Sequence, residues 1–239
     1  MRGALAALAL SALLSGCSGS SENGDLSIYA ASSLTEAFQA IDPDATFSFA
    51  GSDDLATQIK EGAPADVYAA ASPKYPDELF EAGLVDKPEV FATNRLVLIV
   101  PKANPASIGS VADLRRKGVK LVIGAEGVPI GDYTRKVLEN MVATDVLTNV
   151  ASEEDDVKGV VGKVSLGEAD AGFVYATDVK PVAGKVRAIG LPASAQARIE
   201  YEIAVVKSAE HHDEAHAFVE RVLGEAGRRA LSRAGFGLP

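Results

Sequence analysis

Short apolar runs alternate with amphipathic stretches along most of the chain, and this alternation restricts the fold more than any other feature of the sequence. Leu26–Ala30 and Leu96–Val100 have the length and composition of buried strands, whereas Leu34–Ile41 repeats its apolar residues with the period of a helix. Strands are likewise predicted over Thr46–Ala50 and Ala171–Tyr175, and helices over Asp132–Val142 and Glu153–Leu166. Strand–helix–strand alternation is typical of mostly parallel sheets with helices on both faces. The sequence therefore predicts an α/β fold.

A second lobe is predicted from the length of the chain and from two of its strands. The chain has 239 residues, which is long for one doubly wound sheet and suits two smaller ones. The strands Leu96–Val100 and Ile203–Val206 are unusually apolar and lie far apart in the sequence. We expect them to begin and end an inserted lobe, so that two strands cross between the lobes. The predicted lobe 1 comprises residues 25–94 and 201–239, and the predicted lobe 2 comprises residues 95–200.

The first 24 residues have the pattern of an export signal. Arg2 precedes an apolar run over Ala4–Leu14, which is shorter than the roughly 20 residues that a membrane-spanning helix needs. The stretch that ends at Cys17 (LSGC) then resembles the bacterial lipobox, in which the cysteine is acylated and becomes the mature N-terminus. We expect a lipoprotein signal peptide over 1–16, lipid on Cys17 and a flexible tether over 17–24. Ordinary cleavage nearby with a free thiol is the alternative.

The mature chain is expected to be strongly acidic. Removal of Arg2 with the signal peptide takes the 23 basic residues to 22, against 33 acidic residues. Such a surface repels nucleic acids and anionic lipid head groups, so we expect no nucleic-acid partner. Attachment to a membrane must then come from acyl chains. Cys17 is the only cysteine, so no disulfide can form within the chain.

The most informative residues lie where strands or loops lead into helices. Helix N-termini carry unpaired N–H groups and a partial positive charge, so several that converge can bind an anion. Any one of these junctions alone has a simpler interpretation, because a serine before a helix is commonly an N-cap that contributes about 1 kcal/mol. The four junctions are residues 29–34, 49–55, 127–133 and 152–157.

These junctions, with other stretches in the same order, resemble the molybdate-binding proteins of molybdate ABC importers. The resemblance covers essentially the whole mature chain, and its most specific parts are the GAPAD stretch and the Val-Tyr before Ala-Thr-Asp. The matching stretches are residues 30–35 (AASSLT), 49–52 (FAGS), 55–59 (LATQI), 62–67 (GAPADV), 128–133 (VPIGDY), 154–158 (EDDVK), 174–178 (VYATD) and 201–206 (YEIAVV).

The resemblance implies a periplasmic-binding-protein-like fold whose two lobes close on one tetrahedral oxyanion without a lysine or arginine contact. Ser33 and Ser52 would donate hydroxyl and backbone N–H groups, Ile130 and Val157 would donate backbone N–H groups, and Tyr175 would donate its phenolic O–H. The ligand would be molybdate or tungstate, and the protein would need no cofactor. We expect a monomer at the outer face of the cytoplasmic membrane or in the periplasm, which delivers its ligand to an ABC permease.

Asp53 departs from the family, which commonly has a small hydroxyl residue after Ser52. One interpretation is a surface acid in the first turn of a helix, where the macrodipole stabilises it. The other is a proton acceptor that admits phosphate. Ile130 is also bulkier than the small residue common in the family, although its backbone role is unaffected. Binding of phosphate or sulfate is therefore the main alternative function.

Other clusters of chemically active residues lack the pattern that a metal site or an active site needs. His212 and His216 have helical spacing, but a pair lacks the third or fourth ligand that zinc needs, so we interpret them, with His211, as exposed histidines. The acidic run Glu153–Asp156 lacks a calcium-loop pattern and is interpreted as the start of a helix capped by Ser152. No nucleophile elbow, P-loop or dinucleotide motif occurs. We expect a binding protein rather than an enzyme, and a secreted hydrolase with a dispersed site is the remaining alternative.

Overall fold

The computed structural model describes residues 26–239. The predicted signal peptide, Cys17 and the tether over 17–24 lie outside the described residues. Within the described part, no helix has both the length and the apolar character needed to cross a membrane.

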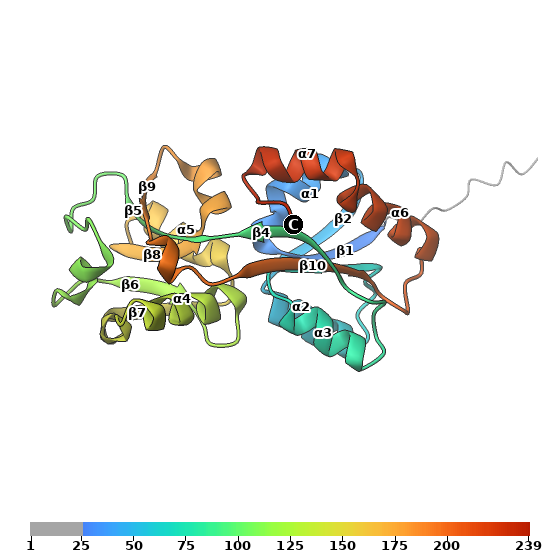
Figure 1. The fold of residues 1–239 in the computed structure, drawn as a ribbon, viewed down its shortest axis with the longest axis horizontal. Coiled ribbons are helices and arrows are strands. Elements are labelled where there is room, and N and C mark those ends of the chain that lie inside the picture. The colour runs from blue at the N-terminus through green and yellow to red at the C-terminus, as the bar shows by residue number, and fades with distance from the viewer. Residues whose placement is uncertain (1–25) are drawn as a thin grey trace, which may run out of the picture.

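The described chain forms two five-stranded sheets that lie end to end (Figure 1). We call the elements around the first sheet lobe 1 and those around the second sheet lobe 2. The first sheet has the order β2-β1-β3-β10-β4 and the second β7-β6-β8-β5-β9. The strands are β1 (Ser27–Ala31), β2 (Thr46–Ala50), β3 (Val67–Ala70), β4 (Glu89–Asn94), β5 (Leu96–Pro101), β6 (Leu121–Gly124), β7 (Val150–Glu154), β8 (Ala171–Tyr175), β9 (Val186–Gly190) and β10 (Ile199–Val205).

Helices cover both faces of each sheet, which confirms the predicted fold class. In lobe 1, α1, α6 and α7 lie on one face and α2 and α3 on the other; in lobe 2, α4 and α5 lie on opposite faces (Figure 1). The helices are α1 (Thr35–Ile41), α2 (Ser52–Lys60), α3 (Lys74–Glu81), α4 (Pro129–Asn140), α5 (Val157–Leu166), α6 (His212–Leu223) and α7 (Glu225–Ala234), with 3-10 helices η1 (Ser32–Leu34), η2 (Val111–Arg115), η3 (Thr144–Asn149), η4 (Ala176–Val182) and η5 (Ala193–Ala195).

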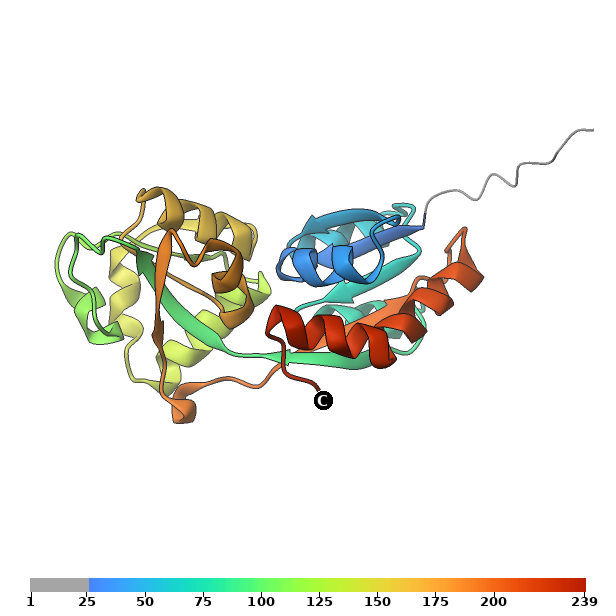
Figure 2. The ribbon, with the colours of Figure 1, turned by 90° about the horizontal axis from the view of Figure 1, so that it is seen from above.

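Two extended segments, β4–β5 and β9–β10, connect the lobes (Figure 2). Strand β5 carries the chain from lobe 1 into lobe 2, and β10 returns it to lobe 1. Each of these two strands is antiparallel to its neighbours. β10 is antiparallel to β3 and β4, and β5 is antiparallel to β8 and β9, whereas the remaining pairings are parallel. Four of the five strands in each sheet therefore run in the same direction, and the crossover strand, β10 in lobe 1 and β5 in lobe 2, runs opposite to them. The lobe boundaries at Arg95 and near Glu200 are our proposal.

Three sequence predictions require correction. The helix predicted over Glu153–Leu166 begins only at Val157, because residues 150–154 pair with β6 as an edge strand. Its cap is Asp156, whose Oδ1 accepts the Gly159 N–H at 2.8 Å, and not Ser152. The helix predicted to start at Asp132 begins at Pro129. Strand β4 was not predicted, because its short, partly polar sequence gives no clear period.

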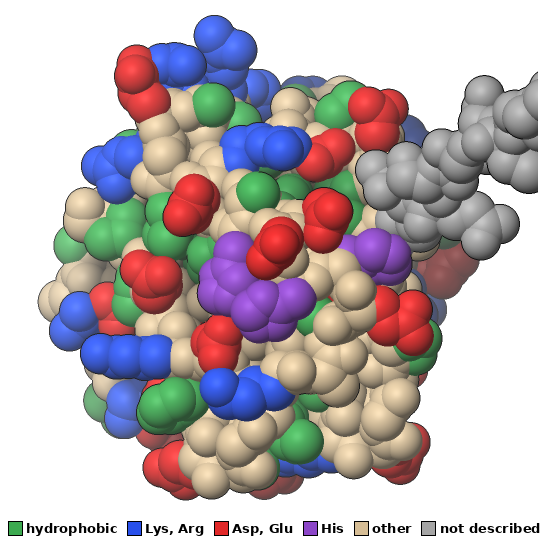
Figure 3. Space-filling view, turned by 90° about the vertical axis from the view of Figure 1, so that its right-hand side faces the viewer, with side chains coloured by type: hydrophobic (Ala, Val, Ile, Leu, Met, Phe, Trp, Pro, Cys, Tyr) green, Lys and Arg blue, Asp and Glu red, His purple; other side chains and the backbone are tan. Residues whose placement is uncertain are grey.

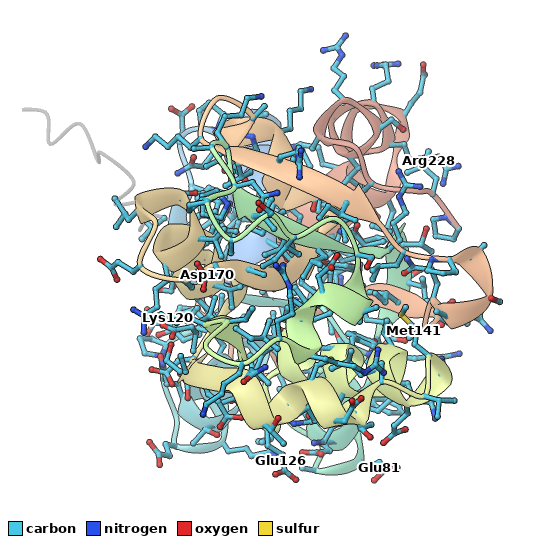
Figure 4. All side chains as sticks on the ribbon, turned by 90° about the vertical axis from the view of Figure 1, so that its left-hand side faces the viewer. Glu81, Lys120, Glu126, Met141, Asp170 and Arg228 are labelled. Atoms are coloured by element: carbon cyan, nitrogen blue, oxygen red, sulfur yellow. The ribbon has the colours of Figure 1, made fainter. Side chains whose placement is uncertain are left out.

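The carboxyl ends of the parallel strands of both sheets face the boundary between the lobes. β6 and β8 begin together at the outer end of lobe 2, where the labelled Lys120 and Asp170 are neighbours (Figure 4) and the Lys120 N–H donates to Asp170 Oδ2 at 2.8 Å. The other ends of these strands, Gly124 and Tyr175, therefore point toward lobe 1. Ligands of α/β folds bind beyond the carboxyl ends of strands. This topology therefore predicts one ligand site at the boundary between the lobes.

Candidate functional site

A small cavity lies at this boundary, and residues of both lobes line it. Its volume in this structure is about 10 Å³, close to the space for one water molecule, so the lining residues of the two lobes approach one another closely. Each of the five predicted ligand-binding residues is among its lining residues. The residues that line the cavity are Ala31, Ser32, Ser33, Ala50, Gly51, Ser52 and Ala71 from lobe 1, and Val128, Pro129, Ile130, Asp156, Val157 and Tyr175 from lobe 2.

Ser33 lies in η1, directly after β1, and is held by a chain of hydrogen bonds. Its Oγ is 2.9 Å from Tyr201 Oη, and the Asn94 side-chain amide approaches the same phenol oxygen at 3.4 Å. Because Asn94 donates to Tyr201, the Tyr201 hydroxyl hydrogen is free to bond to Ser33 Oγ. The Ser33 hydroxyl hydrogen is then left to donate into the cavity.

Ser52 is the first residue of α2 and is also fixed from behind. Its Oγ accepts the Ala71 N–H at 3.1 Å, and Tyr68 donates its hydroxyl to the Ser52 carbonyl at 2.6 Å. A serine oxygen that accepts one bond still carries a hydrogen to donate. Ser52 is buried, with 1% of its surface exposed, and it lines the cavity. Its hydroxyl hydrogen is therefore available to donate to a ligand in the cavity.

Two helix N-termini of lobe 2 supply backbone donors. Ile130 is the second residue of α4, and Pro129 before it has no N–H, so Ile130 presents the first amide of that helix. Val157 is the first residue of α5, and the cap by Asp156 is directed at Gly159. The Val157 N–H therefore stays outside the cap. Both helix ends add a partial positive charge at the cavity.

Tyr175 is the last residue of β8 and is almost completely buried. Its ring packs edge-on against Tyr201, with centroids 5.8 Å apart. Among the described residues, no group bonds to its hydroxyl. Burial raises the pKa of Tyr175 well above its ordinary value, so the phenol stays protonated. A buried hydroxyl without a partner costs free energy, and here it borders the cavity.

The cavity offers donors and lacks basic side chains. Among the described residues that line it, none is a lysine or an arginine. The lining carboxylate, Asp156, caps α5. Asp53 does not line the cavity; it lies in the first turn of α2, and burial raises the pKa of its carboxyl. The site is therefore suited to an anion whose oxygens all accept hydrogen bonds.

Contacts beside the cavity join the two lobes. Lys158, which follows Val157, donates to both carboxylate oxygens of Glu36 in α1 at 3.0 and 3.1 Å. Its Nζ also lies 3.5 Å from Oδ1 of Asp178, a fully buried carboxyl whose pKa is raised to about 7 by burial. Tyr75 of lobe 1 donates its hydroxyl to the Gly127 carbonyl of lobe 2. The molecule therefore has its lobes closed.

Sequence reasoning gave no role to several of these residues. Tyr201 and Asp178 lie in stretches that carry the family resemblance. The resemblance therefore marks these two residues, but it assigns them no role. Lys158 also belongs to such a stretch, but its partner Glu36 is 122 residues earlier. Contacts that depend on the closure of two lobes leave no local pattern in a sequence.

Comparison with known proteins gives one family. The model of the family described as bacterial extracellular solute-binding proteins matches residues 26–237. The molybdate-binding protein ModA of Mycobacterium tuberculosis is 40% identical over 222 residues, which cover 89% of this chain and 84% of that protein.

Solved structures share the fold. The periplasmic molybdate-binding protein of Azotobacter vinelandii matches with a TM-score of 0.78 at 24% identity, over 90% of this chain and 100% of the other. The sulfate-binding protein SubI of Mycobacterium tuberculosis matches with a TM-score of 0.77 at 17% identity, over 89% of this chain and 86% of the other. The fold is thus common to binding proteins for different oxyanions, and only the lining of the site can distinguish them.

Proposed function

This chain belongs to the family of bacterial extracellular solute-binding proteins, and we propose that it captures molybdate outside the cytoplasm and delivers it to the permease of an ABC importer. The observation that carries the proposal is the buried hydroxyl of Tyr175, a residue that lines the cavity, which has no partner among the described residues. An oxyanion would satisfy it together with the free donors of Ser33, Ser52, Ile130 and Val157. The 40% identity to a molybdate-binding protein supports this choice of anion.

The energetics of neutral donors are adequate for such a site. Hydrogen bonds to charged groups contribute about 1.5–3 kcal/mol each. The proposed donors are the hydroxyl and N–H groups of Ser33 and Ser52, the N–H groups of Ile130 and Val157, and the Tyr175 hydroxyl, and together they contribute about 10–20 kcal/mol before costs are subtracted. A micromolar complex needs about 8 kcal/mol. The surplus offsets desolvation of the anion, its lost motion and the closure of the lobes. Oriented dipoles rather than net charge provide the field, which explains how an acidic protein can hold an anion.

Selectivity follows from the same donors. Molybdate and tungstate are fully deprotonated and accept every bond, whereas protonated phosphate needs an acceptor for its own O–H. Asp156 caps a helix, and Asp53 is not among the lining residues. Asp53 Oδ1 is nevertheless buried without a partner among the described residues and would lie 2.7 Å from a Cβ on the cavity-lining Gly51, so Asp53 is the carboxylate to test as that acceptor. We propose tungstate as a second ligand, and rejection of the smaller sulfate because donors spaced for a larger anion would lie too far from its oxygens. Phosphate or sulfate binding is the alternative.

We further propose that the protein is a monomer and is held at the membrane by lipid on Cys17. The LSGC stretch is the support for the anchor, and the tether over 17–24 would keep the binding lobes within reach of the permease at a raised effective concentration. The proposed role is non-enzymatic, in keeping with the solute-binding family. Mass spectrometry of the exported protein tests the anchor: an unmodified Cys17 would rule it out.

A series of anions tests the proposed ligand. Thermal unfolding would be recorded with molybdate, tungstate, sulfate and phosphate at equal concentrations. We expect molybdate and tungstate to raise the melting temperature, because a ligand that binds only the folded state stabilises it. A larger rise with phosphate or sulfate would support the alternative and overturn molybdate as the ligand.

Replacing Ser52 by alanine should weaken molybdate binding by about 1–3 kcal/mol, because one donor to the anion is lost. The Ala71 N–H also loses its acceptor, but this loss affects the free and bound states alike. Calorimetric titration measures the change. Ser165→Ala is the matched control, since it removes a buried hydroxyl that has no partner from α5, and it should leave affinity unchanged. Equal affinity in Ser52→Ala and wild type would mean that Ser52 is not a ligand.

Tyr175→Phe should change ligand binding and stability in opposite directions. Loss of the hydroxyl should weaken molybdate binding by about 1.5–3 kcal/mol. The free protein should become slightly more stable, because a buried hydroxyl without a partner is removed. Titration and urea unfolding measure the two effects. Tyr29→Phe, in the core of lobe 1, should leave affinity at the wild-type value, and a loss of free-protein stability in Tyr175→Phe would contradict the account.

A further inference from the structure

Two histidines that were set aside as an incomplete pair have a third neighbour in the structure. His212 and His216 lie one turn apart on α6, at the end of lobe 1 that faces away from lobe 2, and histidines gather on this face (Figure 3). Asp86, from the segment between α3 and β4, lies beside them. Two histidines alone lack the third ligand that zinc needs, and Asp86 supplies a third donor from more than a hundred residues earlier.

The donor atoms of this cluster have the spacing of a metal site. One donor atom from each of Asp86, His212 and His216 falls within 4.8 Å of the other two. His216 Nε2 is 3.5 Å from Asp86 Oδ2, which is long for a hydrogen bond. With bonds of about 2.0–2.1 Å, ligand atoms of a tetrahedral zinc site lie about 3.3 Å apart. Small rotations of exposed side chains would therefore bring all three donors onto one ion.

We propose that Asp86, His212 and His216 bind a divalent transition-metal ion such as Zn²⁺. Two imidazoles and one carboxylate are donors that zinc accepts, whereas calcium and magnesium prefer oxygen ligands alone. Water would complete the coordination, because the cluster is open to solvent, with 46% of the His216 side chain exposed. The ion would link α6 to the segment before β4 and so stabilise lobe 1.

Lys207 is a cation beside this site, and the geometry accommodates it. Its Nζ lies 2.7 Å from Oδ1 of Asp86, whereas Oδ2 is the oxygen on the side of His216. The lysine thus uses the oxygen that the ion does not need, and it orients the carboxylate as an outer-shell partner. With 54% of its side chain exposed, Lys207 can also swing into solvent when an ion binds.

Zinc titration of the full mature protein tests the proposal. The protein must carry no histidine tag and is stripped with a chelator before use. We expect one saturable Zn²⁺ site by calorimetry, and at least about tenfold weaker binding in each of His212→Ala, His216→Ala and Asp86→Asn. The matched control is His211→Gln, because the ring of His211 contacts Asp66 and not the cluster, and it should bind Zn²⁺ as tightly as wild type.

A second readout separates loss of a ligand from loss of the fold. Zn²⁺ should raise the melting temperature of wild type and His211→Gln but not that of the cluster variants, while far-ultraviolet circular dichroism without metal stays the same. Molybdate binding should be unaffected in the cluster variants and in His211→Gln, since the cluster lies at the end of lobe 1 away from the cavity. Absence of saturable binding below about 1 mM Zn²⁺ in wild type, or equal binding in wild type and cluster variants, would overturn the site.

Discussion

Gly51→Ala should lower molybdate affinity at least about 100-fold while leaving the free protein folded and stable. Gly51 lies between β2 and α2 in lobe 1 and lines the cavity. A Cβ at this position would lie 2.5 Å from the Asp155 carbonyl oxygen of lobe 2. Backbone atoms on both sides cannot move aside independently, so the added methyl group would hold the lobes apart.

The size of this effect follows from what an incomplete closure removes. Ile130, Val157 and Tyr175 all donate from lobe 2, and each bond to the anion contributes about 1.5–3 kcal/mol. The backbone of Gly51 has φ −60° and ψ 141°, which alanine adopts without strain. The free protein can open and avoid the clash. Stability should therefore change little, although binding is nearly lost.

Gly162→Ala is the matched control for Gly51→Ala. Gly162 lies in α5, and a Cβ there would meet no atom within 4 Å. We expect unchanged affinity and slightly higher stability, because alanine favours a helix. Small-angle scattering with molybdate should show a compact protein for wild type and Gly162→Ala, and an extended one for Gly51→Ala. Wild-type affinity in Gly51→Ala would mean that the closed arrangement is not the bound one.

Asp178→Asn should stabilise the protein at neutral and alkaline pH. Burial raises the pKa of Asp178 from 3.8 to about 7 in spite of Lys158. Between about pH 4 and 7 the folded state holds a proton that the unfolded state has lost, so the free energy of unfolding of wild type falls as pH rises. This pKa change lowers the free energy of unfolding of wild type by at most about 4 kcal/mol at pH 8. The destabilisation is absent at a pH where Asp178 is protonated in both the folded and the unfolded state.

Urea unfolding between pH 4 and 8 measures this difference. The stability gained by Asp178→Asn should be small near pH 4 and increase toward pH 8. Asp44→Asn replaces an exposed carboxyl and should give a difference close to zero at every pH. A gain for Asp178→Asn that is constant with pH would show that the buried carboxyl does not titrate as described.

The sequence was sufficient to predict the regular core elements of this fold. Strands β2 and β8 have the predicted bounds, since Thr46–Ala50 alternates polar and apolar residues with the period of a strand and Ala171–Tyr175 is a short apolar run. The sequence predicts a helix from Glu153 because an acidic run leads into an amphipathic stretch, whereas residues 150–154 form an edge strand. Their strand conformation depends on pairing with β6, which is a tertiary contact and has no counterpart in the local pattern.

Ligand donors were easier to predict than the groups that orient them. Ser33 lies just beyond the end of β1 and Tyr175 is the last residue of β8, so topology places each of them at the carboxyl edge of its sheet. Tyr201 reaches Ser33 from 168 residues away, and only the assembled sheet brings them together. Residues that act through another side chain are therefore the part of the site that a single sequence hides, as the Asp86 neighbour of the two histidines also illustrates.

Calorimetric titration of the mature wild-type protein with molybdate tests the central claim most directly. The account predicts one saturable site per chain with micromolar or tighter affinity, and molybdate binding that exceeds that of phosphate and sulfate. Absence of heat and of saturation with molybdate, or tighter binding of phosphate, would contradict it.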